Sequence, residues 1–404
     1  MCMMITRVTL LGNKDHGKST MIGSMLMLTR SVTKERIADA QRISRSLKRK
    51  FEPGFILDSF SEEREGGLTI DTTRAQIKYK GAAFELIDVP GHEELIHNMI
   101  SGASYASFAI LIISAKEGER ITTQTKRHLF LAKMLGIEKI IIAVNKMDTI
   151  NYSKEAFNSI KDDMLKFLRG IGLEHGNTIF IPVSAYNSDN IMSRSANMPW
   201  YKGDILLDAM SKSSGPVKKQ GLLRISIQGS IGTGNSSLAT GKVISGTIKK
   251  SDVVYLFPGK TLLKVAKLYV KGKEKRASHC GDDIAIKFDR RISSARGSII
   301  SGKDSEPRTS GTFQSTIFFT KEPARRVALR YNGVEIQALI NVKRTIDVAT
   351  GTELQRKTSM ALNAAKVTVK PLKKIAFEKF SEFPELGRFT VYTKSGFSGI
   401  GIID

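Results

Sequence analysis

The sequence predicts an α/β fold: a doubly wound, mostly parallel sheet followed by two β-barrels. Three observations carry this prediction. Short apolar runs alternate with amphipathic stretches in the first half, glycine-punctuated strand-like segments fill the second half, and two polar breaks separate the parts. We therefore expect domains at residues 1–212, 222–302 and 308–404, with a linker at 213–221.

The first domain is expected to consist of βα units. Its apolar, β-branched runs are short, and each is followed by a segment with helical periodicity, which favours a sheet that is buried on both faces. The expected strands lie at 7–12, 83–89, 108–114, 139–146 and 179–184, and the expected helices at 19–29, 93–102, 123–135, 154–168 and 204–210.

The second half changes character after the segment "SKSSGPVKKQG" at 211–221, which lacks apolar periodicity. Short strand-like segments with frequent glycines follow, as an all-β barrel requires. A second break, "SGKDSEPRTSG" at 301–311, divides them into two series. The expected strands are 222–228, 241–248, 252–257, 262–270 and 283–288 in the first barrel, and 312–319, 325–331, 334–346, 364–372 and 387–393 in the second.

The composition excludes several classes of protein. No window approaches the roughly 18 apolar residues that a membrane helix needs, and the start "MCMMITRVTLLG" is typical of a first strand and not of a signal peptide. We therefore expect a cytoplasmic protein without a membrane partner. Cys2 and Cys280 lie far apart, which argues against a disulfide framework or a zinc site.

The net charge of +24 is unevenly distributed. Residues 215–404 carry 34 lysines and arginines against 15 aspartates and glutamates, so this half holds +19 of the total. A field of that sign attracts polyanions, which favours RNA binding. The alternative is a basic surface that is simply solvated.

The segment "GNKDHGKST" at 12–20 predicts a phosphate-binding loop. It follows a predicted strand and begins a predicted helix, which is the context in which this glycine and lysine spacing cradles phosphates. Lys18 would reach the β and γ phosphates, and the Ser19 hydroxyl would bind Mg²⁺. The predicted nucleotide-binding residues of this segment are Asn13, Lys14, Asp15, His16, Gly17, Lys18, Ser19 and Thr20.

The segment "NKMD" at 145–148 selects guanine. Asp148 can accept two hydrogen bonds from the N1–H and the 2-amino group of guanine, which adenine does not offer, and Asn145 can meet the N7 side of the base. Lys146 lies between them. Further along, the backbone N–H groups of "SAY" can reach the guanine O6, and this segment comprises Ser184, Ala185 and Tyr186. GTP and GDP are therefore the predicted ligands.

Two further segments are expected to sense the last phosphate. Asp88 ends a predicted strand and would hold Mg²⁺ through water, while Gly91 would turn its backbone N–H toward the γ-phosphate. Thr69 lies in a charged loop, "EEREGGLTID", which would become ordered only when the γ-phosphate and Mg²⁺ are bound. Ser19, Thr69 and Asp88 are the predicted magnesium ligands.

These motifs together resemble the translational GTPases of the elongation factor Tu and elongation factor 1-alpha group. The resemblance is carried by "GNKDHGKSTMIG", "EEREGGLTID", "DVPGHEELIHNMISGAS", "NKMD", "MPWYKG" and, near the end, "EKFSEFPELGRF". The insertion at about residues 33–55 and the C-terminal segment make the chain most similar to the elongation factor 1-alpha branch. Ribosome-rescue GTPases and the GTPase subunit of sulfate adenylyltransferase share this layout.

The resemblance implies GTP hydrolysis with His92, Lys18 and Thr69 as catalytic residues. His92 would position the attacking water, and Lys18 with Mg²⁺ would meet the transition-state charge. It also implies that the partners are tRNA or a tRNA-mimicking protein and the ribosome, with a guanine-nucleotide exchange factor as a further candidate, and that the chain acts as a monomer.

Lys14 departs from the family pattern, in which a small apolar residue at this position forms a gate with the residue before the switch threonine, here Leu68. Either the Lys14 side chain turns to solvent and leaves half a gate, or its charge lies near the γ-phosphate and alters hydrolysis. Asp15 would add a negative contact near the phosphates or bind a monovalent cation.

The basic residues expected to contact RNA lie in the first barrel. They are Lys271, Lys273, Lys275, Arg276, Arg290, Arg291 and Arg296. The preferred function is a translation factor that holds tRNA or a tRNA mimic in the GTP state. The alternatives are a GTPase subunit of sulfate adenylyltransferase and a GTP-sensing protein with negligible turnover.

Overall fold

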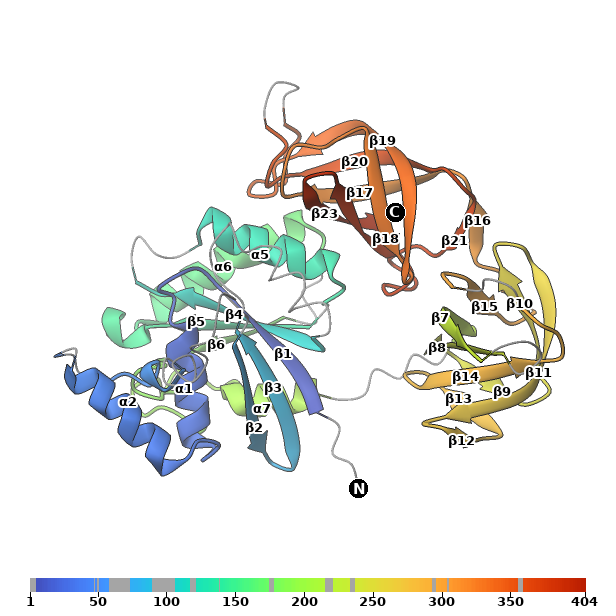
Figure 1. The fold of residues 1–404 in the computed structure, drawn as a ribbon. Coiled ribbons are helices and arrows are strands. Elements are labelled where there is room, and N and C mark those ends of the chain that lie inside the picture. Colours follow the sequence, from blue (N-terminus) through green and yellow to red (C-terminus); the bar gives the residue numbers. More distant parts are fainter. Residues whose placement is uncertain are drawn as a thin grey trace. The chain divides into compact units, whose positions relative to one another are not determined.

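The computed structural model (Figure 1) describes residues 5–46, 48, 51–57, 73–88, 106–116, 121–137, 139–173, 178–214, 221–232, 237–292, 296–303, 305–354 and 359–404. The chain divides into two compact units. One comprises Met1–Gly215 and Val348–Gly351, and the other comprises Pro216–Asp347 and Thr352–Asp404. The finer boundaries at 212, 222, 302 and 308 stay a prediction. The helix expected at 93–102 lies outside the described residues.

The first unit contains a six-stranded sheet in the order β2-β3-β1-β4-β5-β6. Strand β2 runs antiparallel to β3, and the other neighbours are parallel. This arrangement confirms the predicted doubly wound, mostly parallel sheet. The strands are β1 (Ile5–Leu11), β2 (Thr73–Tyr79), β3 (Ala82–Asp88), β4 (Phe108–Ser114), β5 (Ile140–Asn145) and β6 (Thr178–Pro182).

Helices cover both faces of this sheet. All seven residues of β4 are buried, which requires cover on both sides because successive side chains point to opposite faces. Figure 1 shows α1 and α7 on one face and α5 and α6 on the other. The described helices of this unit are α1 (Lys18–Leu28), α2 (Lys34–Ser46), α5 (Thr123–Met134), the 3-10 helix η2 (Met147–Ile150), α6 (Lys154–Gly170) and α7 (Leu206–Ser213).

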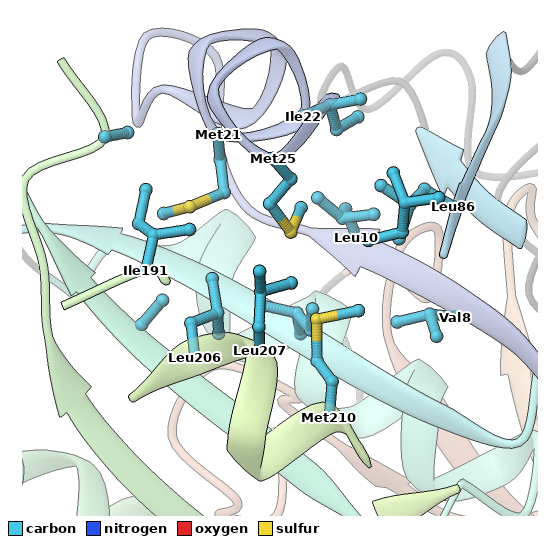
Figure 2. Close-up of a cluster of buried hydrophobic side chains, with 14 of the residues drawn as sticks. Val8, Leu10, Met21, Ile22, Met25, Leu86, Ile191, Leu206, Leu207 and Met210 are labelled. Atoms are coloured by element: carbon cyan, nitrogen blue, oxygen red, sulfur yellow. The ribbon is translucent and has the colours of Figure 1, made fainter. Parts of the chain in front are cut away.

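A buried core lies under α1, at the end of the sheet where β1 leads into the predicted phosphate-binding loop. We call this loop, residues 12–17, the glycine loop. Met25 of α1 points toward Leu10 of β1 and Leu207 of α7, and Met21 points toward Ile191 (Figure 2). All of these side chains are fully buried. Burying each of them contributes on the order of 2 kcal/mol. The helix is therefore held firmly at the point where β1 ends and the glycine loop begins.

The second unit begins with the first barrel. Six strands follow each other in the order β10-β15-β7-β8-β14-β11, and pairing between β10 and β11 closes the ring. They are β7 (Arg224–Ile231), β8 (Leu238–Ser245), β10 (Val253–Phe257), β11 (Thr261–Val270), β14 (Asp283–Phe288) and β15 (Ile299–Ser301). Three short strands flank the barrel: β9 (Thr247–Lys249), β12 (Lys273–Glu274) and β13 (Ala277–His279).

The second barrel is closed in the order β17-β20-β19-β18-β22-β23. Its strands are β17 (Phe313–Phe319), β18 (Arg326–Tyr331), β19 (Val334–Ile346), β20 (Ala364–Pro371), β22 (Arg388–Thr393) and β23 (Gly396–Ile403). A separate pair, β16 (Arg308–Ser310) and β21 (Ile375–Phe377), precedes and follows it. Two closed barrels after the α/β sheet confirm the predicted fold class.

A buried ion pair joins the two barrels within this unit. Arg224 of β7 donates its Nε–H to Glu378 at 2.5 Å, and both side chains are almost fully buried. Arg308 contacts the other carboxylate oxygen of Glu378 at 3.2 Å. Burial raises the pKa of Glu378, and the two guanidinium groups oppose that shift. Removing one partner would leave a buried charge unpaired, which should be strongly destabilising.

No helix among the described residues is long and apolar enough to cross a membrane.

Candidate functional site

The glycine loop connects the end of β1 at Leu11 with the start of α1 at Lys18. Gly17 caps the helix with a φ of 88°, a left-handed conformation that side chains rarely adopt. A Cβ atom there would also lie 2.4 Å from Asn145 Nδ2. Glycine is therefore required at this position, and the helix N-terminus stays accessible to a phosphate group.

Lys18 lies inside the curve of this loop. Its ammonium group donates hydrogen bonds to the backbone carbonyls of Gly12 and Asn13, each at 2.9 Å, and the residue is 8% exposed. Burial lowers the pKa of Lys18, while the carboxylates of Asp88 and Asp15 oppose that shift. The amino group of Lys18 thus lies in a largely dry site, where the attraction between a positive charge and a phosphate is strong.

Asn145 ties the glycine loop to the predicted base-binding loop. It lies at the end of β5 and is 2% exposed. Its Nδ2 donates to the carbonyl of His16 at 2.9 Å, and its Oδ1 accepts the backbone N–H of Ala185 at the same distance. The structure thus brings together the two segments that are predicted to bind the phosphates and the guanine base.

Asp148 lies in η2, next to that junction. Its Oδ1 accepts a hydrogen bond from the Ser184 hydroxyl at 2.6 Å, and Ser184 is fully buried. A fixed serine therefore orients the carboxylate that is predicted to bind the guanine edge. Lys146 precedes η2 in a left-handed conformation, and Tyr186 is 45% exposed beside this loop.

Asp88 at the end of β3 is suited to a metal ion. Its Oδ1 is buried and has no hydrogen-bond partner among the described residues. Burial raises the pKa of Asp88 to about 6, and the nearby Lys18 ammonium opposes that shift. A buried carboxylate oxygen without a partner requires an explanation. A hard cation such as Mg²⁺ prefers such oxygen ligands, so Asp88 and the Ser19 hydroxyl of α1 fit the predicted magnesium ion.

The remaining loop residues differ in exposure. His16 is buried, with its Nδ1 3.1 Å from the carbonyl of Ile112. Thr20 lies in the first turn of α1 and is half-buried. Asp15 is exposed at a φ of 64°. Lys14 is exposed, and its backbone N–H donates to Asn13 Oδ1 at 2.8 Å. The Lys14 side chain is therefore exposed to solvent; because Leu68 lies outside the described residues, the choice between the two alternatives given above stays a prediction.

Comparison with known proteins assigns the family. Residues 3–265 match the elongation factor Tu GTP binding domain, and residues 320–404 match the GTP-eEF1A C-terminal domain-like family. The chain belongs to the elongation factor Tu family of GTPases. This GTPase is 34% identical to elongation factor 1-alpha of Aeropyrum pernix over 98% of its own length and 95% of that protein. It is 35% identical to elongation factor 1-alpha of Hyperthermus butylicus with the same coverage.

Solved structures give a weaker comparison. A structure of Sup35 complexed with GMPPNP has a TM-score of 0.44 and 22% sequence identity, and the match covers 100% of this chain and 94% of that chain. A bacterial selenocysteine-specific elongation factor, EF-Sec, has a TM-score of 0.46, and the match covers 99% of this GTPase and 58% of that chain. These likenesses add nothing to the family assignment.

Three predicted site residues of this GTPase lie outside the described residues. They are Thr69, Gly91 and His92. Leu68, the predicted partner of Lys14 in the gate, lies outside them as well. Their roles in catalysis and in phosphate sensing stay predictions.

A buried pair in α5 was not predicted as part of the site. Gln124 and His128 are one helical turn apart, and their side-chain nitrogens Nε2 lie 3.1 Å from each other. Burial, together with the positive charges of Lys18, His16 and Arg127, lowers the pKa of His128 to about 3. His128 is therefore neutral near the glycine loop. The only signal in the sequence is the four-residue spacing of two polar side chains in an apolar helix face.

The seven basic residues predicted to contact RNA form two groups. All are exposed. One group lies around the β11–β12 turn, next to the end of β14 at Ile284, and comprises Lys271, Lys273, Lys275 and Arg276. The other group follows the opposite end of β14, at Phe288, and comprises Arg290, Arg291 and Arg296. With about 3.3 Å per residue along a strand, the groups are separated by roughly the length of β14. The structure does not bring the two groups together at one point.

The pKa of Asp88 gives a prediction for stability. Its folded pKa of about 6 exceeds the ordinary value of 3.8, so the folded state loses stability as pH rises from about 4 to about 6. Without nucleotide and metal, Asp88→Asn should therefore unfold with a free energy higher than wild type by up to about 3 kcal/mol at pH 7, and within about 0.5 kcal/mol of wild type at pH 4. Urea denaturation in EDTA at both pH values measures this difference. Equal stabilities at pH 7 would contradict the account of Asp88.

Proposed function

We propose that this GTPase binds tRNA, or a protein that mimics tRNA, in its GTP state and brings it to the ribosome. The observation that supports this most is the extent of the match: relatives named elongation factor 1-alpha align with 98% of the chain, including both barrels. A nucleotide domain alone would match GTPases of many functions. The barrels supply the surface that a cargo needs, and they carry most of the positive charge.

The nucleotide site would bind GTP or GDP through the residues described above. Ser19 and Asp88, with Thr69, would hold Mg²⁺, which neutralises charge on the phosphates when it is bound. Lys18 would exchange its two carbonyl partners for phosphate oxygens. His92 would orient the water that attacks the last phosphate, and Thr69 and Gly91 would sense whether that phosphate is present.

The basic residues of the first barrel would contact the phosphates of RNA. Two separated groups at the ends of β14 suit an extended polyanion better than a single phosphate group. Such contacts weaken steeply as salt rises, because binding releases counterions from the RNA. An exchange factor, a monomeric state and a cytoplasmic location belong to the same proposal.

The proposed alternative, a GTPase subunit of sulfate adenylyltransferase, is not favoured. The relatives reported above are named as translation factors. A partner enzyme would also offer no phosphate backbone to the exposed lysines and arginines of the barrels.

The test of the proposed function combines cargo binding with ribosome stimulation. We expect aminoacyl-tRNA to bind about 10- to 100-fold tighter in the presence of a nonhydrolysable GTP analogue than with GDP, with an affinity that falls as salt rises. Single-turnover hydrolysis should accelerate when ribosomes are added, and His92→Ala should remove about 100-fold or more of that acceleration.

Filter binding and quenched-flow measurements give these quantities. Lys166→Ala, a change at an exposed lysine of α6, is a control that should leave both unchanged. Equal tRNA binding in the GTP-analogue and GDP states, or hydrolysis that ignores ribosomes and His92, would contradict the proposal.

A further inference from the structure

Two loops at the predicted guanine site, residues 145–152 and 184–190, contain several strained residues, and we call them the base-binding loops. Five of their residues other than glycine have left-handed backbones, with φ between 51° and 64°: Lys146, Asn151, Tyr152, Ser188 and Asn190. Asparagine tolerates this region, but a bulky residue such as tyrosine rarely adopts it. Strained residues persist where surrounding contacts hold them, and they gather at functional sites.

The half-buried Tyr152 side chain bridges the two base-binding loops. Tyr152 follows η2, the helix that carries Asp148, and its backbone N–H donates to the carbonyl of Met147 at 2.8 Å. Its hydroxyl donates to Oδ2 of Asp189 and accepts a hydrogen bond from Nδ2 of Asn187, each at 3.1 Å. One side chain thus connects the segment after "NKMD" with the segment after "SAY".

Asp189 passes this connection on to the start of its own loop. Its backbone and that of Ser184 exchange two hydrogen bonds, at 3.0 and 3.3 Å. Its Oδ1 accepts the Ser195 hydroxyl at 2.6 Å, so each oxygen of the carboxylate has its own donor. Hydrogen bonds to a charged group are roughly twice as strong as those between neutral groups, so this carboxylate is held in one orientation.

These contacts form a closed ring around the carboxylate that is predicted to bind guanine. The Ser184 hydroxyl donates to Oδ1 of Asp148 at 2.6 Å, and it accepts the backbone N–H of Asn187 at 3.2 Å. The ring passes through Asp148, Ser184, Asp189 and Tyr152 and returns along η2. A connected network of this kind keeps two loops in register, because breaking one link lets both of them relax.

Two further contacts anchor the ring to the body of the first unit. The indole N–H of Trp200 donates to the carbonyl of Tyr152 at 3.1 Å. Nδ2 of the buried Asn190 donates to the carbonyl of Pro182, at the end of β6, at 2.9 Å. Neither contact uses the Tyr152 hydroxyl. Removing that hydroxyl would therefore open the ring while leaving both anchors in place.

We propose that Tyr152 is a positioning residue for guanine recognition: acting through Asp189 and Ser184, its hydroxyl holds the Asp148 carboxylate in the orientation that accepts both the N1–H and the 2-amino group of the base. This inference rests on the proposed guanine site, in which Asp148 accepts those two donors. A carboxylate that is free to turn still accepts one donor, whereas two hydrogen bonds at once require a fixed orientation. Tyr152 itself contributes no atom to the base.

Inosine diphosphate, IDP, separates the orientation of this carboxylate from nucleotide binding in general. Its base keeps the N1–H of guanine but lacks the 2-amino group, so the ratio of the affinities for GDP and IDP measures the second hydrogen bond to Asp148. Calorimetric titration of the full-length protein in magnesium gives both affinities. Wild type should prefer GDP by about 10-fold or more. Tyr152→Phe, which removes one oxygen atom and keeps the ring, should reduce this preference at least about 3-fold.

Tyr79→Phe is the matched control. Tyr79 also donates its hydroxyl to a carboxylate, Oδ1 of Asp208 at 2.8 Å, but it lies on β2, at the opposite edge of the sheet from β6. This variant should keep the wild-type ratio. Asp189→Ala should lower the ratio at least as much as Tyr152→Phe, and the double variant should lower it no further than Asp189→Ala alone, because the hydroxyl acts through that carboxylate.

Three results would overturn the proposal. One is a Tyr152→Phe variant that keeps the wild-type ratio while unfolding at a lower temperature or unchanged, since a merely structural role would leave the ratio alone. Another is an additive loss in the double variant, and the third is an equal loss in Tyr79→Phe. All three leave the GDP preference of wild type intact and reject only the role of Tyr152, whereas equal binding of GDP and IDP by wild type would contradict the proposed guanine site itself.

Discussion

GTP hydrolysis by the Lys18→Ala variant is expected to fall at least about 100-fold. Lys18 is the buried cation inside the glycine loop, and its ammonium group is held 2.9 Å from two loop carbonyls in a largely dry site. When GTP is bound, it would face charge that develops on the transferred phosphate, where a positive charge lowers the barrier most. Single-turnover hydrolysis of radiolabelled GTP measures the loss.

Lys14→Ala is the matched control for this variant. Both lysines belong to the same loop, but Lys14 is exposed, whereas Lys18 is 8% exposed. We expect Lys14→Ala to change hydrolysis less than about 3-fold, because an exposed charge is screened by solvent. An equal loss in the two variants would show that loop structure, and not the buried ammonium group, accounts for the effect.

Asp148→Asn is expected to change the base that the protein prefers from guanine to xanthine. The variant loses two charge-assisted hydrogen bonds to guanine, and GDP affinity should fall by about 100-fold or more. Asparagine can instead donate its N–H to the 2-carbonyl of xanthine. Its Oδ1 can still accept the Ser184 hydroxyl that orients this side chain, so the loop should keep its structure.

Calorimetric titration with GDP and with xanthosine diphosphate measures this exchange. Ser184→Ala is the companion variant: it removes the orienting hydroxyl and should weaken GDP binding about 5- to 10-fold without favouring xanthine. If Asp148→Asn lost affinity for both nucleotides alike, the change would have damaged the loop and the base-recognition role would be contradicted.

The first part of the fold could be predicted well because its signals are local. Buried runs such as that of β4 and the helix start at Lys18 follow directly from apolar periodicity and glycine placement. Strand β2 was not predicted. Ala75 and Ile77 are buried, whereas the residues between and beside them, Arg74, Gln76 and Lys78, are exposed. Only this short period-two pattern marks the strand in the sequence.

The end of the second barrel shows why local signals fail. Strand β23, with the sequence "GFSGIGII", has a composition that favours a turn. A Cβ atom at position 399 would lie 2.3 Å from the carbonyl oxygen of Phe318 in β17, so the glycine is needed for the close approach of these two strands, which lie far apart in the sequence. Contacts between distant segments decide such positions, and a single sequence does not display them.

For the candidate site, residue types and order along the chain predicted the ligand, whereas the supporting contacts came only from the structure. Asn145 was predicted to meet the base, and the structure shows that it also holds the glycine loop and Ala185 together. The Ser184–Asp148 hydrogen bond and the neutral His128 likewise depend on tertiary packing. No periodic pattern in the sequence encodes these contacts.

The central claim is that one site on the first unit selects a guanine nucleotide. Calorimetric titration of the wild-type protein with GDP and with ADP, in magnesium, is the most direct measurement, and it is the reference for the Asp148→Asn comparison. The account predicts that GDP binds at least about 1,000-fold tighter than ADP, because a mismatched base leaves the Asp148 carboxylate without its donors. Equal affinities, or no heat with either nucleotide, would contradict it.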